Sequence, residues 1–133
     1  CLVFKNISWN ILNKSSLTNL NKWREGFLKD YFSFGEIIKP KPIECENVNV
    51  GSFDGFLFIV DKIITFAYLF NDTIFQIIIN NCNIEKEVTF DNKYKIYTNY
   101  LDSENNFVDN KIKIIPYGVV AIQIPRIRRI KNV

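Results

Sequence analysis

The feature that most constrains this chain is a change in the spacing of its apolar residues near Gly35. From Ser15 to Tyr31, apolar residues recur every three or four positions, which is the period of one face of an α-helix. After Gly35 the chain divides into short apolar or alternating segments separated by Asn, Asp and Gly, the pattern of antiparallel strands. One helix followed by a run of strands is an unusual start for an independent domain. We therefore expect these residues to be the end of a longer protein.

The helix is expected to start at a polar turn and to stop at Gly35. Ser15 or Ser16 can accept a hydrogen bond from a free N–H of the first turn. Gly26 lowers the helix propensity by about 1 kcal/mol relative to alanine. The apolar stripe, which we expect to contact a sandwich or a barrel, consists of Leu17, Leu20, Trp23, Phe27, Leu28 and Tyr31.

The remainder predicts a mainly β fold, an antiparallel β-sandwich of Greek-key-like type with about eight strands. We assign residues 1–38 to the terminal helix segment and its connector, residues 39–125 to the sandwich and residues 126–133 to a basic tail. The expected strands are Ile43–Val50, Phe56–Val60, Ile63–Phe70, Thr73–Asn80, Glu85–Phe90, Tyr94–Tyr97, Lys111–Ile115 and Tyr117–Ile124.

Composition excludes several kinds of chemistry. The chain has no histidine, so neither a Ser-His-Asp triad nor a histidine general base can be built from it. Three widely spaced cysteines, Cys1, Cys45 and Cys82, form no CxxC pair, so we expect no metal site, no cofactor and a reducing, cytoplasmic location. A net charge of +3 and the absence of an apolar run of about 20 residues predict neither a nucleic acid partner nor a membrane partner.

The carboxylates do not suggest a catalytic pair. Retaining glycosidases need two carboxyl groups about 5 Å apart, one of them with a raised pKa. Here the aspartates fall at expected turns, where this residue is favoured by local hydrogen bonding. Glu85 and Glu87 flank Lys86 on one strand, a solvated pattern. We interpret them all as structural: Asp54, Asp61, Asp72, Asp91, Asp102 and Asp109.

Three tyrosines close together offer the one candidate for ligand contact. Tyr94, Tyr97 and Tyr100 could stack against a sugar ring, because tyrosine combines an apolar ring with a polar hydroxyl. The alternative, which we favour, is that they cover the edge of the sandwich.

Four stretches, in this order, resemble the C-terminal end of the α-amylase family of glycoside hydrolases. They correspond in that family to the loop after the last barrel strand, the last barrel helix, a strand pair of the following sandwich and its closing strands. The stretches are Ile7–Asn10, Leu20–Leu28 with Ser33–Gly35, Asp61–Asn81, and Tyr97–Asp102 with Asn110–Ile124. Related barrel glycosidases such as α-galactosidases also place a sandwich after their last helix and remain an alternative.

The resemblance implies a C-terminal, non-catalytic domain of an α-glucan-active glycosidase. Its partner would be the catalytic barrel of the same protein and, through it, an α-glucan. The nucleophile and the general acid would belong to upstream barrel strands, so no catalytic residue is expected in this chain. Two other hypotheses are a free-standing β-sandwich module that binds carbohydrate and a purely structural interaction domain.

Overall fold

The computed structural model describes residues 9–45, 50–89, 95–99, 102–104 and 111–124. It is mainly β with antiparallel sheets, and helices precede the strands, as the sequence predicted. The helical elements are η2 (Trp9–Ile11), α1 (Lys14–Glu25) and α2 (Lys29–Phe34). The strands are β1 (Glu36–Ile38), β2 (Glu44–Cys45), β3 (Ser52–Asp54), β4 (Leu57–Val60), β5 (Ile63–Phe70), β6 (Thr73–Asn80), β7 (Lys86–Thr89), β8 (Lys95–Asn99), β9 (Asp102–Glu104), β10 (Lys111–Ile114) and β11 (Val119–Ile124).

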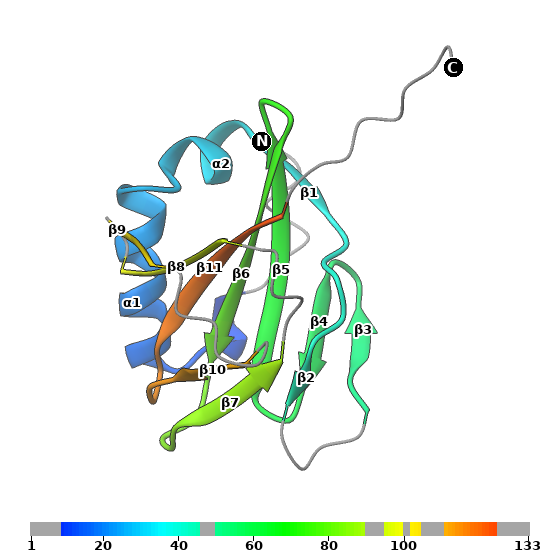
Figure 1. Cartoon of the computed structure of the whole chain (residues 1–133), viewed down its shortest axis with the longest axis vertical. Helices are drawn as coiled ribbons and strands as arrows, with labels where there is room; N and C mark the ends of the chain where they lie inside the picture. Colours follow the sequence, from blue (N-terminus) through cyan, green and yellow to red (C-terminus); the bar gives the residue numbers. More distant parts are fainter. Residues whose placement is uncertain (1–8, 46–49, 90–94, 100–101, 105–110, 125–133) are drawn as a thin grey trace.

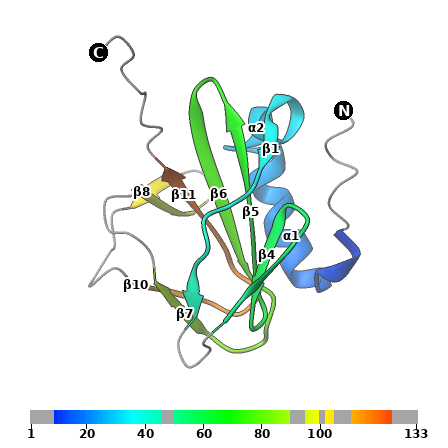
Figure 2. The same ribbon diagram turned by 90° about the vertical axis from the view of Figure 1, so that its right-hand side faces the viewer.

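The strands form two sheets of unequal size. The large sheet has the order β3-β4-β5-β6-β11-β8-β9, and β1 pairs with β5 beyond the end of β4. The small sheet has the order β10-β7-β2. Figure 1 shows α1 and α2 beside the large sheet, and the turned view in Figure 2 places β7 and β10 away from the helices. The described part of the chain therefore has three layers: helices, large sheet and small sheet.

The helix breaks where the sequence carries Gly26. The N–H of Leu28 donates to the carbonyl of Trp23 at 3.0 Å, and α2 begins only at Lys29. The break shifts the buried positions, so that Leu28 and Phe32 face the sheet while Phe27 stays 39% exposed. The expected single helix is therefore wrong after Gly26, although Phe27 still packs on the sheet, with its ring centroid 4.9 Å from that of Tyr97 and 5.4 Å from that of Phe75.

Gly35 marks the change from helix to strand for a steric reason. Its N–H donates to the carbonyl of Tyr31 at 3.0 Å and ends α2. A Cβ at this position would lie 2.4 Å from the Tyr31 oxygen and 3.2 Å from the Leu69 oxygen. Only glycine fits this approach without a shift of the backbone, and β1 then follows directly.

The two faces of the large sheet bury different side chains. The face under the helices packs aromatic rings among leucine and isoleucine side chains, and its buried rings are those of Trp23, Phe32, Phe66, Tyr68 and Phe75. We call this the aromatic core. The face under the small sheet packs almost entirely isoleucine and valine, and we call it the aliphatic core; its members are Ile43, Cys45, Phe58, Val60, Ile63, Ile78, Val88, Ile96, Ile112, Ile114, Val120, Ile122 and Ile124.

A buried glutamine holds the connector that leads from β1 to the small sheet. Pro40 and Pro42 have no N–H, so Lys41 carries the only N–H of these three residues. Gln76 Oε1 accepts that N–H at 2.9 Å, and Gln76 Nε2 donates to the Lys41 carbonyl at 2.9 Å. The side chain thus replaces the strand that would otherwise pair with this segment.

The two strands of the long hairpin, β5 and β6, have the bounds that the sequence predicted. Three short strands were not predicted, namely β1, β3 and β9. Each has three residues, too few to show a period, and each is placed by its neighbour in the sheet. β1 lies within residues 1–38, which the sequence assigned to the helix segment and connector, yet it is hydrogen-bonded to β5.

Candidate functional site

Tyr97, the one described member of the tyrosine group, lies in the aromatic core. Its ring stacks on Phe27 at 4.9 Å between centroids and meets Phe75 edge-on at 5.4 Å. Its hydroxyl lies 3.0 Å from Gln123 Oε1 and donates to it. These contacts use one ring face and the hydroxyl in packing. Tyr94 and Tyr100 lie outside the described residues, so the platform of three tyrosines stays a prediction.

Of the aspartates expected at turns, Asp61 and Asp72 lie in turns, whereas the backbones of Asp54 and Asp102 lie in strands β3 and β9. Asp61 and Asp72 have positive φ values of 56° and 66° in the two turns that flank β5. Asp61 forms an ion pair with Lys86, and this hydrogen bond raises the pKa of the Lys86 ammonium group. Asp54 ends β3 and is exposed. Asp91, Asp109 and the side chain of Asp102 lie outside what the structure describes.

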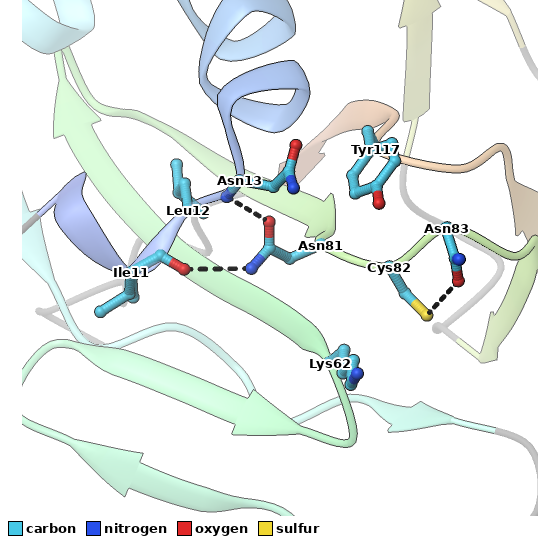
Figure 3. Close-up of a pocket in the computed structure, with 8 residues that line it drawn as sticks. All are labelled: Ile11, Leu12, Asn13, Lys62, Asn81, Cys82, Asn83 and Tyr117. Atoms are coloured by element: carbon cyan, nitrogen blue, oxygen red, sulfur yellow. Dashed lines mark hydrogen bonds between the residues drawn. The ribbon is translucent and has the colours of Figure 1, made fainter.

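A polar hollow lies where the start of α1 meets the turns at the end of the large sheet. It has a volume of about 440 Å³. Figure 3 shows its lining, in which Asn13 and Asn81 lie on one side, Tyr117 and Asn83 on the other, and Lys62 at the β4–β5 turn. The complete lining is Ile11, Leu12, Asn13, Lys62, Asn81, Cys82, Asn83 and Tyr117. We call this the amide recess.

Asn81 fixes one wall of the amide recess. Its Oδ1 accepts from the N–H of Asn13 and from the hydroxyl of Ser16, both at 2.8 Å. Its Nδ2 donates to the carbonyl of Ile11 at 3.1 Å. Asn13 in turn caps α1, because its Oδ1 accepts from the N–H of Ser15 at 2.9 Å. One asparagine at the end of β6 therefore sets the position of the helix layer.

Tyr117 forms the opposite wall in a conformation that non-glycine residues seldom adopt. Its φ is 58°. The turn is held because the Tyr117 N–H donates to the carbonyl of Cys82 at 3.1 Å, and Asn19 Nδ2 donates to the carbonyl of Tyr117 at 2.8 Å. These bonds keep the Tyr117 side chain at the recess despite the backbone strain.

A second hollow, of about 470 Å³, lies around Arg24 and is lined by residues of α1 and α2. The guanidinium lies over the rings of Trp9 and Phe32, at 5.5 and 5.7 Å from their centroids. It also donates to Asn21 Oδ1 at 3.0 Å. Arg24 is thus a packing residue that joins η2 to the helices.

Sequence reasoning did not find the amide recess. Its residues come from four separate segments, and asparagines are so frequent in this chain that none stood out. The one usable signal was the pair Asn80-Asn81 at a strand end. Among the described residues, no group of three or more His, Cys, Asp or Glu side chains could hold a metal ion. No helix in the described ranges is both long and apolar enough to span a bilayer.

Comparison with known proteins adds no relative. No protein-family model matches the chain, and neither a curated protein nor a solved structure shows significant similarity.

Proposed function

We propose that this chain is a non-catalytic accessory β-sandwich of an α-amylase-like glycosidase acting on α-glucans, and that it stabilises the catalytic barrel. The order of the four sequence stretches supports this proposal. That order is the observation that carries it, and the joining of helix and sandwich in one aromatic core, through Leu20, Trp23, Leu28 and Phe32, is the route by which the sandwich would stabilise a barrel. A barrel that ends in this helix would be coupled rigidly to the sandwich.

The surface for the barrel would then be the outer side of the helix layer. The stripe itself faces the sheet of this chain, since Leu20 and Trp23 are buried. Phe34, at the end of α2, is 73% exposed and lies 6.4 Å from Phe70 between ring centroids, whereas Phe27 packs on the sheet against Tyr97 and Phe75. Among the described residues of α1 and α2, Phe34 is the most exposed apolar ring, and it would be the centre of the contact with the barrel.

A free-standing module is the second candidate, and the burial of the stripe favours it. A helix that needed a barrel to cover it would leave Leu20 and Trp23 exposed, whereas both are buried here by the large sheet. Such a module would bind carbohydrate or another protein without an attached catalytic domain.

The coding sequence upstream of Cys1 tests the two candidates directly. A barrel encoded in the same reading frame, with the longer protein melting lower when this part is removed, is the result expected from an accessory domain. An independent start next to Cys1, or an unchanged melting temperature of the barrel, would contradict it. The isolated chain should not hydrolyse an α-glucan, and hydrolysis would contradict the proposal that it is non-catalytic.

A pair of surface variants tests the contact. Phe34→Ser should lower the melting temperature of the longer protein, because it removes apolar area from the contact with the barrel. Val50→Ser is the matched control, since Val50 is 78% exposed and lies next to β3, outside the helix layer. Equal effects of the two variants would show that the helix layer is not the contact.

A glycan array tests the free-standing candidate. Binding that is lost in Tyr97→Ala and kept in Tyr97→Phe would support a carbohydrate-binding module in which the ring, and not the hydroxyl, contacts the sugar. No binding in the wild type is what the accessory proposal predicts.

A further inference from the structure

We propose that the amide recess binds a small oxyanion, that is, a phosphate or carboxylate group. Its volume of about 440 Å³ is within the range of small-molecule sites. Lys62 is the one charged residue among the eight that line it, and no carboxylate is among them. Asp61 beside it is already paired with Lys86. An anion in the recess therefore meets a positive charge without an opposing acidic neighbour in the lining.

The lining amides use their oxygens within the chain more than their NH₂ groups: Asn81 Oδ1 accepts two hydrogen bonds, and Asn13 Oδ1 accepts one. Asn13 Oδ1 accepts from the Ser15 N–H, and Asn81 Oδ1 accepts from the Asn13 N–H. A backbone N–H can only donate, so these two bonds fix which side-chain atom is oxygen and which is nitrogen. Asn13 therefore retains its NH₂ group, and Asn81 retains the one hydrogen of Nδ2 that does not reach the Ile11 carbonyl.

The other side of the recess is also rich in donors. The thiol of Cys82 lies 3.7 Å from Asn83 Oδ1, which leaves the NH₂ of Asn83. Within the described part of the chain, no hydrogen bond engages the Lys62 ammonium group or the Tyr117 hydroxyl. Figure 3 shows the Tyr117 hydroxyl directed towards the segment that carries Cys82 and Asn83.

This inventory of donors selects the ligand class. An oxyanion accepts several hydrogen bonds and donates none, which matches a lining of NH₂, ammonium and hydroxyl groups. A neutral polyol also needs acceptors, and these are fewer here than the donors, because Asn81 Oδ1 already accepts two hydrogen bonds and the oxygens of Asn13 and Asn83 accept one each. The proposal does not depend on the start of α1, where Asn13 already caps the Ser15 N–H. It is independent of the proposed glycosidase origin.

The test is a titration of the full chain followed by ¹⁵N NMR of the side-chain NH₂ groups. Sodium phosphate is used in one arm, sodium succinate in a second, and sodium chloride at matched ionic strength is the control. We expect saturable shifts of the Asn13 and Asn83 NH₂ signals with at least one oxyanion and none with chloride. Saturation with phosphate alone identifies a phosphate site, and saturation with succinate alone identifies a carboxylate site.

Two matched variants locate the site. Lys62→Met should weaken binding about fivefold, the effect of one partly exposed charge. Lys29→Met removes the same charge from an exposed position on α2 and should leave the affinity unchanged. Asn83→Leu removes an exposed donor without touching the cap and should also weaken binding. Shifts that chloride reproduces, or equal losses in the Lys62 and Lys29 variants, would overturn the proposal.

Discussion

The aromatic core and the aliphatic core lie on opposite faces of one sheet but are built differently. The aromatic core joins helices to strands through ring contacts, such as Phe32 with Tyr68 at 4.9 Å and Trp9 with Phe66 at 5.4 Å. The aliphatic core joins two sheets through β-branched side chains, which pack well on pleated surfaces. Large rings fill the uneven space between a round helix and a twisted sheet, whereas two sheets meet along flatter surfaces.

The two faces also differ in their buried polar groups. Thr65, Gln76 and Asn80 are fully buried, and their positions in β5 and β6 alternate with those of the aromatic core, so they lie on the aliphatic face. Gln76 bonds the Lys41 segment, and Asn80 Nδ2 lies within 3.1 Å of three carbonyls, those of Ile84, Ile114 and Ile115. Polar side chains therefore hold the connections on the aliphatic face, whereas on the other face ring packing, together with the hydrogen bonds of Asn81 to Asn13 and Ser16, holds the helices.

The largest expected effect comes from the centre of the aromatic core. Phe66→Ala should lower the free energy of unfolding by about 4 kcal/mol, because it removes a fully buried ring. Urea unfolding measures this change. Ile122→Val, which trims the aliphatic core by one methylene, should cost about 1 kcal/mol. Comparable losses would show that the two cores respond alike.

The next largest effect tests the two hydrogen bonds between the Gln76 side chain and the backbone of Lys41. Gln76→Met keeps the side chain's length but leaves the N–H and carbonyl of Lys41 without their partner, which should cost about 2 kcal/mol. Gln123→Met is the matched variant on the aromatic face, where Gln123 accepts one bond from Tyr97 and is half-buried. It should cost less than about 1 kcal/mol. A smaller loss of unfolding free energy for Gln76→Met than for Gln123→Met would show that the Gln76 bonds do not hold the connector.

Alkaline pH should weaken the aromatic core. Burial raises the pKa of Tyr68 from 10.0 to about 12. The folded state therefore resists loss of this proton, so the contribution to stability is complete below pH 10 and falls as the pH rises from 10 towards 12. The expected loss is about 1 kcal/mol per pH unit. Unfolding of wild type and Tyr68→Phe across this range should diverge, and parallel curves would contradict the assignment.

The smallest expected effect is at the edge of the aromatic core. Tyr97→Phe removes the hydrogen bond to Gln123 but keeps the stack on Phe27, and should cost about 0.5 kcal/mol. Tyr97→Ala removes the ring as well and should cost clearly more. Thermal unfolding of the two variants separates the ring from the hydroxyl, and equal melting temperatures would show that the ring contributes nothing.

The parts of the fold that the sequence predicted are the long segments with a regular pattern of apolar residues. β5 and β6 are eight-residue strands bounded by Asp61, Asn71 and Asp72, all with positive φ, so pattern and turn residues agree. The break after Gly26 was missed because a single glycine is tolerated in many helices, and only packing on the sheet selects the break. The helix layer was expected as a contact to sandwich or barrel, and it is a layer of the sandwich itself.

The candidate site could not be predicted from the sequence, for a different reason. Asn13, Lys62, Asn83 and Tyr117 come together only through the register of β5, β6 and β11, which no local pattern specifies. The NH₂ groups of Asn13 and Asn83 are available to a ligand because the oxygen of each side chain, and not its nitrogen, forms the hydrogen bond within the chain. Which of these atoms are hydrogen-bonded depends on distances between residues far apart in the sequence.

The most direct test of the account is whether helices and sheets unfold together. Both tryptophans, Trp9 and Trp23, pack against the aromatic core, so their fluorescence reports the helix side, while circular dichroism near 217 nm reports mainly the sheets. One folded unit predicts that the two urea transitions coincide in midpoint and slope. A tryptophan transition at clearly lower urea, with the sheet signal unchanged, would show that the helices are held only loosely and would contradict the account.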